Sequence, residues 1–235
     1  MFFYCGSLQY LGISEFNTSE VKDMSFMFSN CRSISVLDVS KFKTGKAENM
    51  AGMFQYCISL SNIDVEGFDT NNVKSMSGLF QDTTGVSRLD VSNFKTGNVE
   101  DMSKMFLDCT NLLTLDVSHF DTSKVVDFSE MFSGCSIISS LDVSHFDTSK
   151  VTNTSYMFYY MNSIKTLDVS NFKTSEVKDM SHMFRFCKIV TALDVSKFNT
   201  SNVVNMISMF EDCGKITVLD VSNFDTSKVT SFERM

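Results

Sequence analysis

The chain contains no proline and no tryptophan among its 235 residues. Proline commonly marks irregular loops, so its absence predicts that this chain has few of them. No apolar run approaches about 18 residues, which argues against a transmembrane helix. The opening segment, MFFYCGSLQY, has neither a basic start nor a small-residue cleavage site. We therefore expect no signal peptide in this chain.

Positive charge is also scarce. The formal net charge is −8, and the 20 lysines and arginines are not clustered. Nucleic acids and anionic membranes require a positive footprint, so we expect neither as a partner. Apolar residues make up 43% of the chain, which is enough for a sizeable core and argues against disorder.

Phenylalanine and methionine are in excess, with 23 and 16 residues. A 26-residue repeat explains them. An LDV-like triplet returns at this interval without insertion or deletion, and we number repeat positions 1 to 26 from it. The repeats begin at residues 11, 37, 63, 89, 115, 141, 167, 193 and 219. We expect one repeat array over residues 1–235, with a partial repeat at 1–10 and a partial last repeat at 219–235.

Several repeat positions are nearly constant. Positions 6 and 18 are phenylalanine in all nine copies, positions 14 and 17 hold 15 of the 16 methionines, and position 21 holds all seven cysteines. A strict period of this kind predicts a solenoid. One coil cannot bury its apolar face alone, but stacked coils place like residues over like and create a continuous core.

The local pattern within a repeat predicts two kinds of element. Positions 1 to 4 alternate Leu, Asp, Val and Ser, which indicates a strand with Leu and Val inward. Position 13 is Asp, Asn or Ser and suits a helix N-cap. The apolar positions 14, 17, 18 and 21 then follow the spacing of one helix face, with a 3₁₀ segment as the alternative.

We therefore predict an α/β solenoid of nine coils, with a parallel β-sheet on one side and short helices or 3₁₀ turns on the other. Parallel strands stack at about 4.8 Å, whereas packed helices are about 8–10 Å apart. This mismatch predicts a curved array with the strands on its concave side.

The unit LDVSxFDTSxVxDMSxMFxxCxxL resembles the repeat of BspA-like leucine-rich-repeat surface proteins of bacteria. The resemblance covers all nine repeats. It implies a leucine-rich-repeat-like, right-handed coil, an extracellular or cell-surface location, a role in adhesion, and no catalytic residues. Within these 235 residues we expect neither the export signal nor the anchor of full-length members.

Position 2 supplies a row of outward carboxylates. Two kinds of compensation are open: hydrogen bonds from nearby serine or backbone donors, or a ligand such as calcium or a basic partner. The first is favoured, because calcium needs about 6–8 oxygens and one row does not provide them. The row comprises Asp38, Asp64, Asp90, Asp116, Asp142, Asp168, Asp194 and Asp220.

Three other constant or paired side chains invite a chemical interpretation. His119 and His145 share position 5 in adjacent repeats, where a transition metal is conceivable but a tolerant surface position is favoured. The cysteines are expected to be buried thiols rather than disulfides. Position 8 is threonine in every copy, which we interpret as capping of turn amides rather than as an ice-binding row.

No nucleophile–base arrangement and no nucleotide-binding loop occurs in the sequence. We expect no enzymatic activity, cofactor or metal. The leading hypothesis is a recognition or adhesion solenoid that binds a protein or glycan on a cell surface or matrix. Its contacts are expected along the aspartate row, with His119 and His145. The alternative is end-to-end self-association into fibres or layers, since the chain starts and finishes at position 17.

Overall fold

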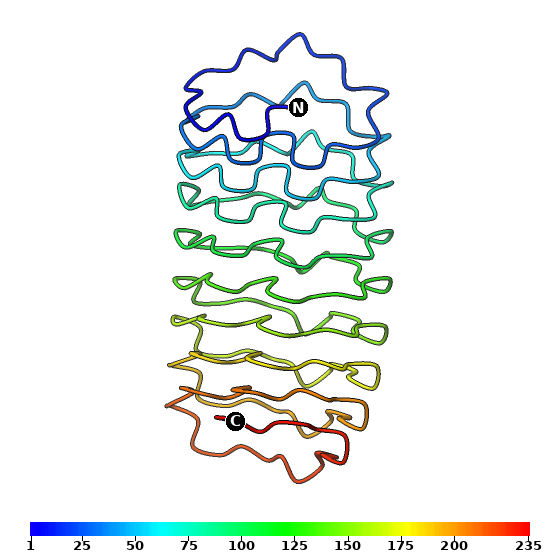
Figure 1. The fold of residues 1–235 in the computed structure, drawn as a ribbon, viewed down its shortest axis with the longest axis vertical. Coiled ribbons are helices and arrows are strands. Elements are labelled where there is room, and N and C mark those ends of the chain that lie inside the picture. Colours follow the sequence, from blue (N-terminus) through cyan, green and yellow to red (C-terminus); the bar gives the residue numbers. More distant parts are fainter.

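The computed structural model describes residues 1–235 as a column of stacked coils. Successive repeats form successive coils along the long axis, with the two termini in the coils at opposite ends (Figure 1). The interval of 26 residues separates the partners in every isolated β-bridge. Equivalent positions of neighbouring repeats therefore lie next to one another.

The prediction of strands and short helices in each coil is wrong. No residue is α-helical or 3₁₀-helical. None of the 99 backbone–backbone hydrogen bonds lies within a helix or a named strand, and pairing is limited to eight isolated parallel bridges. The chain is thus not an α/β solenoid with a parallel sheet on one side and helices on the other. The reason for expecting curvature disappears with the helices.

Successive β-turns occupy the segment that was expected to be helical. In the first repeat, the amide of Met27 donates to the carbonyl of Met24, and the amide of Cys31 donates to that of Phe28. The third residues of these turns, Phe26 and Asn30, have φ of 53° and 61°. An i to i+3 bond with a left-handed third residue is the pattern of a type II turn. The first and last residues of each turn point inward, which reproduces the helical spacing.

Left-handed backbone recurs at positions 16 and 20 of every repeat. This conformation is cheapest for glycine and tolerable for Asn and Asp, and it is costly for most other residues. The non-glycine residues concerned are Tyr4, Phe26, Asn30, Tyr56, Asp82, Lys104, Asp108, Glu130, Tyr156, Tyr160, His182, Phe186, Ser208, Asp212 and Arg234. The glycines are Gly52, Gly78 and Gly134.

Neighbouring coils are joined by backbone hydrogen bonds along positions 12 to 20. The amides at positions 14, 16, 18 and 20 donate to carbonyls of the following coil, as Met24 does to Asn49 and Phe28 does to Met53, at 2.8 and 3.0 Å. Seven of the eight bridges lie at position 13 of this segment. The side chain at position 13 accepts the amide at position 15, so the predicted cap residue caps a turn instead of a helix.

The LDVS segment pairs with no neighbouring strand, and two amides of the stretch from Leu37 to Phe42 donate within the coil. The amide of Ser40 donates to the Asp38 carboxylate, and the amide of Phe42 donates to the Val39 carbonyl in a second kind of turn. A parallel ladder would need these donors. The alternation of Leu and Val still places both side chains in the core.

The interior is one cluster of 64 buried apolar residues. A single column of position-18 rings runs through it. Each ring lies 5.7–6.0 Å from the next and nearly parallel to it, which is an offset-stacked arrangement. The column comprises Phe2, Phe28, Phe54, Phe80, Phe106, Phe132, Phe158, Phe184 and Phe210.

The threonines at position 8 also join coils. Eight of them donate a hydroxyl hydrogen bond to the carbonyl at position 7 of the following coil, at 2.9–3.1 Å. All eight are buried, and the most exposed of them, Thr18, is 4% exposed. They therefore form no exposed row, and their bonds reach another coil rather than the local turn alone.

The seven cysteines are free, and five of them are buried. Six donate their thiol to the position-18 carbonyl of the preceding coil at 3.0–3.2 Å. Burial raises the pKa of Cys57 and of Cys109 to about 12. These thiols are packing groups, as expected, and at neutral pH they are protonated.

Candidate functional site

The aspartate row lies on the surface, and each of its carboxylates is used locally. Oδ1 of all eight accepts the amide of the residue two positions later at 2.9–3.2 Å. In four repeats the serine hydroxyl at position 4 donates to the same oxygen. Compensation by nearby donors, the favoured interpretation, is what the structure shows.

These hydrogen bonds also affect ionisation. Bonds from the Ser118 hydroxyl and amide hold the pKa of Asp116 below its usual range, and Ser144 has the same effect on the pKa of Asp142. The same cause lowers the pKa of Asp38, Asp90, Asp194 and Asp220. These six carboxylates are therefore charged at neutral pH, and all eight of the row serve as turn caps.

His119 and His145 link adjacent coils. Nε2 of His119 lies 2.8 Å from the Val91 carbonyl, and Nε2 of His145 lies 3.1 Å from that of Val117. Asn93 makes a similar link with its side-chain amide, which donates to the Glu66 carbonyl one residue further along the preceding coil. Side chains at position 5 thus form hydrogen bonds between adjacent coils. No group of three or more His, Cys, Asp or Glu side chains is arranged to hold a metal ion.

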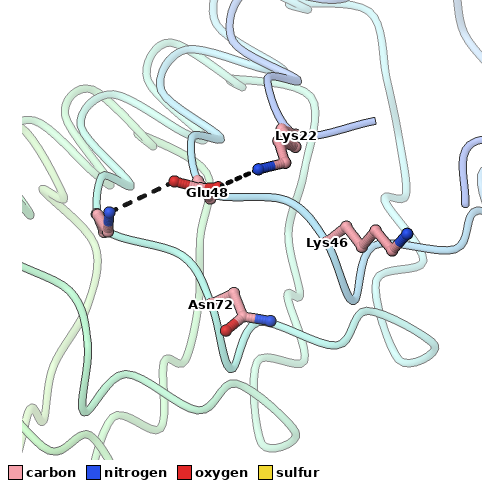
Figure 2. A pocket seen from close by; sticks show the side chains of 5 residues that line it. Lys22, Lys46, Glu48 and Asn72 are labelled. Atoms are coloured by element: carbon pink, nitrogen blue, oxygen red, sulfur yellow. Dashed lines mark hydrogen bonds and ion pairs between the residues drawn. The ribbon is translucent and has the colours of Figure 1, made fainter. Parts of the chain in front are cut away.

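A surface hollow of about 550 Å³ lies over positions 10 and 12 of the first three repeats. It is lined by Lys22, Lys46, Glu48, Asn72 and Lys74. Figure 2 shows the Glu48 carboxylate between two lysines, Lys22 at 3.1 Å and Lys74 at 3.4 Å, while Lys46 extends away from it. Lys46 pairs with Glu20 at 2.7 Å. These are exposed ion pairs of small energetic value, and they neutralise much of the local charge.

A cluster of aromatic side chains occupies the outer turns of the sixth and seventh repeats. We call Tyr156, Tyr159, Tyr160, His182 and Phe186 the aromatic patch. Tyr156 and His182 stack with ring centroids 4.3 Å apart, and Tyr159, Tyr160 and Phe186 lie 5.6–5.9 Å from one another. Burial lowers the pKa of His182, so its ring is neutral at pH 7.

Two cations flank the aromatic patch. The Arg185 guanidinium lies 4.7 Å from the centroid of the Phe186 ring and pairs with Glu211 at 2.8 Å. The Lys188 ammonium lies 5.6 Å from the same ring. Both are within the range of cation–π attraction. The patch therefore combines apolar ring surface with an ion-paired arginine and with a lysine that contacts the rings but no carboxylate.

Sequence reasoning did not find this patch, because it placed the contact surface on the LDVS side. The signal was nevertheless present. Residues 156–160 read YMFYY and contain three of the six tyrosines. At positions 16 and 20 the other repeats carry mostly glycine, charged or small polar residues. A comparison of outward positions alone would have identified the sixth and seventh repeats as different.

The coils define a class of protein, a solenoid of β-turn coils with a constant interior and variable outer residues. The chain belongs to the family described as "Mycoplasma protein of unknown function, DUF285", whose model matches residues 1–89, 74–188 and 161–235. No curated protein and no solved structure matches the chain. The fold contains no helix of the length and apolar character that crossing a membrane requires.

Proposed function

We propose that the chain is a non-enzymatic recognition solenoid that binds a protein or glycan on a cell surface or matrix. One observation carries the proposal: the repeated polar side chains are engaged in the framework, whereas positions 16, 19 and 20 of the outer turns vary. The aspartates cap turns, and the threonines join coils. Variation on a constant frame is how repeat proteins adjust their binding surfaces.

An extracellular or cell-surface location forms part of the proposal. Its support is the resemblance of the repeat to that of BspA-like surface proteins. The buried, protonated thiols are compatible with such a location, because none of the seven cysteines depends on a disulfide.

Two surfaces are candidates for the contact. The aspartate row keeps its exposure and its negative charge, although one oxygen of each carboxylate is engaged. The outer turns carry aromatic and arginine side chains, which are enriched at the energetic centres of interfaces. We therefore assign the principal contact to the outer turns and a secondary one to the aspartate row.

Binding of the labelled chain to epithelial cells and to immobilised matrix tests the proposal. We expect saturable binding that falls in a Tyr160→Asn/Phe186→Asn variant. It should fall less in an Asp116→Asn/Asp142→Asn/Asp168→Asn variant, which retains the capping oxygen and loses the charge. Absence of saturable binding on both surfaces would contradict the proposal. Filaments in electron micrographs without such binding would support the self-association hypothesis instead.

A further inference from the structure

The aromatic patch is built on backbone that is unfavourable for its residues. Tyr156, Tyr160, His182 and Phe186 have φ of 57°, 60°, 57° and 62°. The left-handed conformation costs a residue with a Cβ about 1 kcal/mol or more relative to glycine. The turns do not require aromatic residues, since Gly52, Gly78 and Gly134 occupy equivalent positions. Strained residues that the fold does not need are indicators of function.

The tyrosine hydroxyls of the patch are free to bind a ligand. Of the six tyrosines, only Tyr56 uses its hydroxyl within the chain, as an acceptor from Gln81. Tyr156, Tyr159 and Tyr160 thus present three unpaired hydroxyls beside their rings. Tyr160 is 41% exposed, and Tyr156 and Tyr159 are half-buried. Such side chains offer an apolar face and a polar edge at the same place.

The charges around the patch do not call for a charged ligand. Arg185 is neutralised by Glu211, and Arg234 approaches the same carboxylate at 3.6 Å. His182 is neutral. The Lys188 ammonium lies over the Phe186 and Tyr160 rings. Lys188 has no carboxylate partner and is the one unpaired cation at the patch. The tyrosine rings and hydroxyls themselves match a ligand with apolar C–H surface and hydroxyl groups.

The size of the patch favours a small ligand. It spans two coils, and its row at position 20 ends at Gly134 on one side and at Asp212 on the other. A standard protein–protein interface buries about 800 Å² on each partner and involves about 20–30 residues. Five aromatic side chains give only a fraction of that surface. A sugar ring has the complementary chemistry: a C–H face for the aromatic ring and hydroxyls for the tyrosine edges.

We propose that the aromatic patch binds an uncharged saccharide by stacking on the exposed Tyr160 ring, against which Phe186 packs edge-to-face, and by hydrogen bonding to the tyrosine hydroxyls. This inference rests on the proposed recognition function and specifies the class of partner at the outer turns. A protein partner or a proline-rich peptide would be a different class and is an outcome of the test.

The test uses the full chain and neutral hexaoses of glucose, galactose and mannose, with a proline-rich peptide and an acidic oligosaccharide alongside. Because the chain has no tryptophan, intrinsic fluorescence reports on its tyrosines, of which the patch holds three of six. Calorimetry provides the second readout. We expect saturable binding of at least one neutral hexaose, with a dissociation constant that rises about tenfold in Tyr160→Asn/Phe186→Asn.

Tyr56→Asn is the matched control, since it makes the same change at position 20 of the second repeat. We expect its affinity to stay within about twofold of the parent, well below the 1.4 kcal/mol of a tenfold change. Asn30 occupies the same left-handed position, so all these variants should fold. Circular dichroism and thermal melting are used to check that each variant folds.

Four results would overturn the inference. They are no binding of any neutral hexaose, binding that the double variant retains, binding of the acidic oligosaccharide alone, and binding of the peptide alone. If the chain also fails to bind cells and matrix, the proposed function fails as well. If it binds them without binding hexaoses, only the saccharide inference fails.

Discussion

The two sides of each coil are held to the next coil by different means. Along positions 12 to 20, backbone amides donate directly to carbonyls of the following coil, as Phe106 does to Met131 at 3.0 Å. Along positions 2 to 8, side chains make the connection, as the Thr96 hydroxyl does to the Asp121 carbonyl at 3.0 Å. The backbone side tolerates different side chains at its outward positions, whereas the side-chain side depends on a repeated consensus.

This difference explains where the sequence varies. Backbone hydrogen bonds do not depend on residue identity, so positions 16, 19 and 20 accept glycine, aromatic and charged residues. The Thr and Asn side chains of the LDVSNFDT segment are themselves the links between coils, and replacing them removes links. Recognition residues are therefore expected on the backbone side, where they cost the frame least.

Removing one ring from the phenylalanine column should have the largest effect on stability. Phe106 is fully buried between Phe80 and Phe132 at 5.9 and 5.8 Å. We expect Phe106→Ala to lower the free energy of unfolding by about 3–5 kcal/mol, because it leaves a cavity that the stacked coils cannot close. Urea denaturation measures the loss. Phe26→Asn, at an exposed turn position, is the control and should change stability by a small fraction of this.

The side-chain links should be next in size. Thr96→Val keeps the shape of the buried side chain and removes the hydroxyl donor to the Asp121 carbonyl. We expect a loss of about 1–3 kcal/mol, since a carbonyl is left without its partner. Thr166→Val, at an exposed position, should be nearly neutral. Equal stability of the two variants would show that the hydroxyls of the position-8 threonines do not hold the coils together.

The aspartate caps should make stability depend on pH. Hydrogen bonds lower the pKa of Asp116 and of Asp142 in the folded chain, so their carboxylates contribute above the unfolded pKa of about 4. That contribution is lost as the pH falls through the lower, folded pKa. We expect the urea midpoint to fall in acid and Asp116→Asn/Asp142→Asn to flatten the fall. Parallel pH profiles for parent and variant would refute a contribution of these two ionised carboxylates to stability.

The smallest effect is a gain. Lys104 has φ of 58°, and its ion pair with Glu130 is exposed. We expect Lys104→Gly to raise the free energy of unfolding by up to about 1 kcal/mol, since glycine accepts this backbone without strain. The melting temperature should rise slightly as a result. Lys150→Gly, whose φ is not positive, should instead be neutral or destabilising. A lower stability for Lys104→Gly than for Lys150→Gly would contradict this account of the turns.

The sequence predicts the interval between coils and the inward positions, but not the local conformation. Spacings of 3, 4 and 7 among Met24, Met27, Phe28 and Cys31 fit one helix face and also fit two successive turns. Turns form instead of a helix because the amides at positions 14, 16, 18 and 20 donate to carbonyls of the next coil rather than to the fourth preceding carbonyl. A contact of that kind is invisible in the pattern of one repeat.

The candidate site was predictable in part. The sequence identified the aspartate row as exposed and favoured local donors for it, which the hydrogen bonds to Ser40 and its equivalents show. It did not identify the aromatic patch, because Tyr156 and His182 become neighbours only when position 16 is known to lie in an outward turn. Residues that are 26 apart in sequence can be recognised as one surface only once that geometry is known.

The uninterrupted column of rings has a consequence for how such a chain changes over generations. Each ring meets its counterparts one period before and after, and its other aromatic contacts, such as that of Phe80 with Phe94, recur at the same interval. Duplication or loss of a whole 26-residue unit in the gene therefore lengthens or shortens the rod and rejoins the column in register. The same event would carry a turn with its tyrosines to a new distance from any other binding surface, so reach and valency can evolve without redesign of the interior.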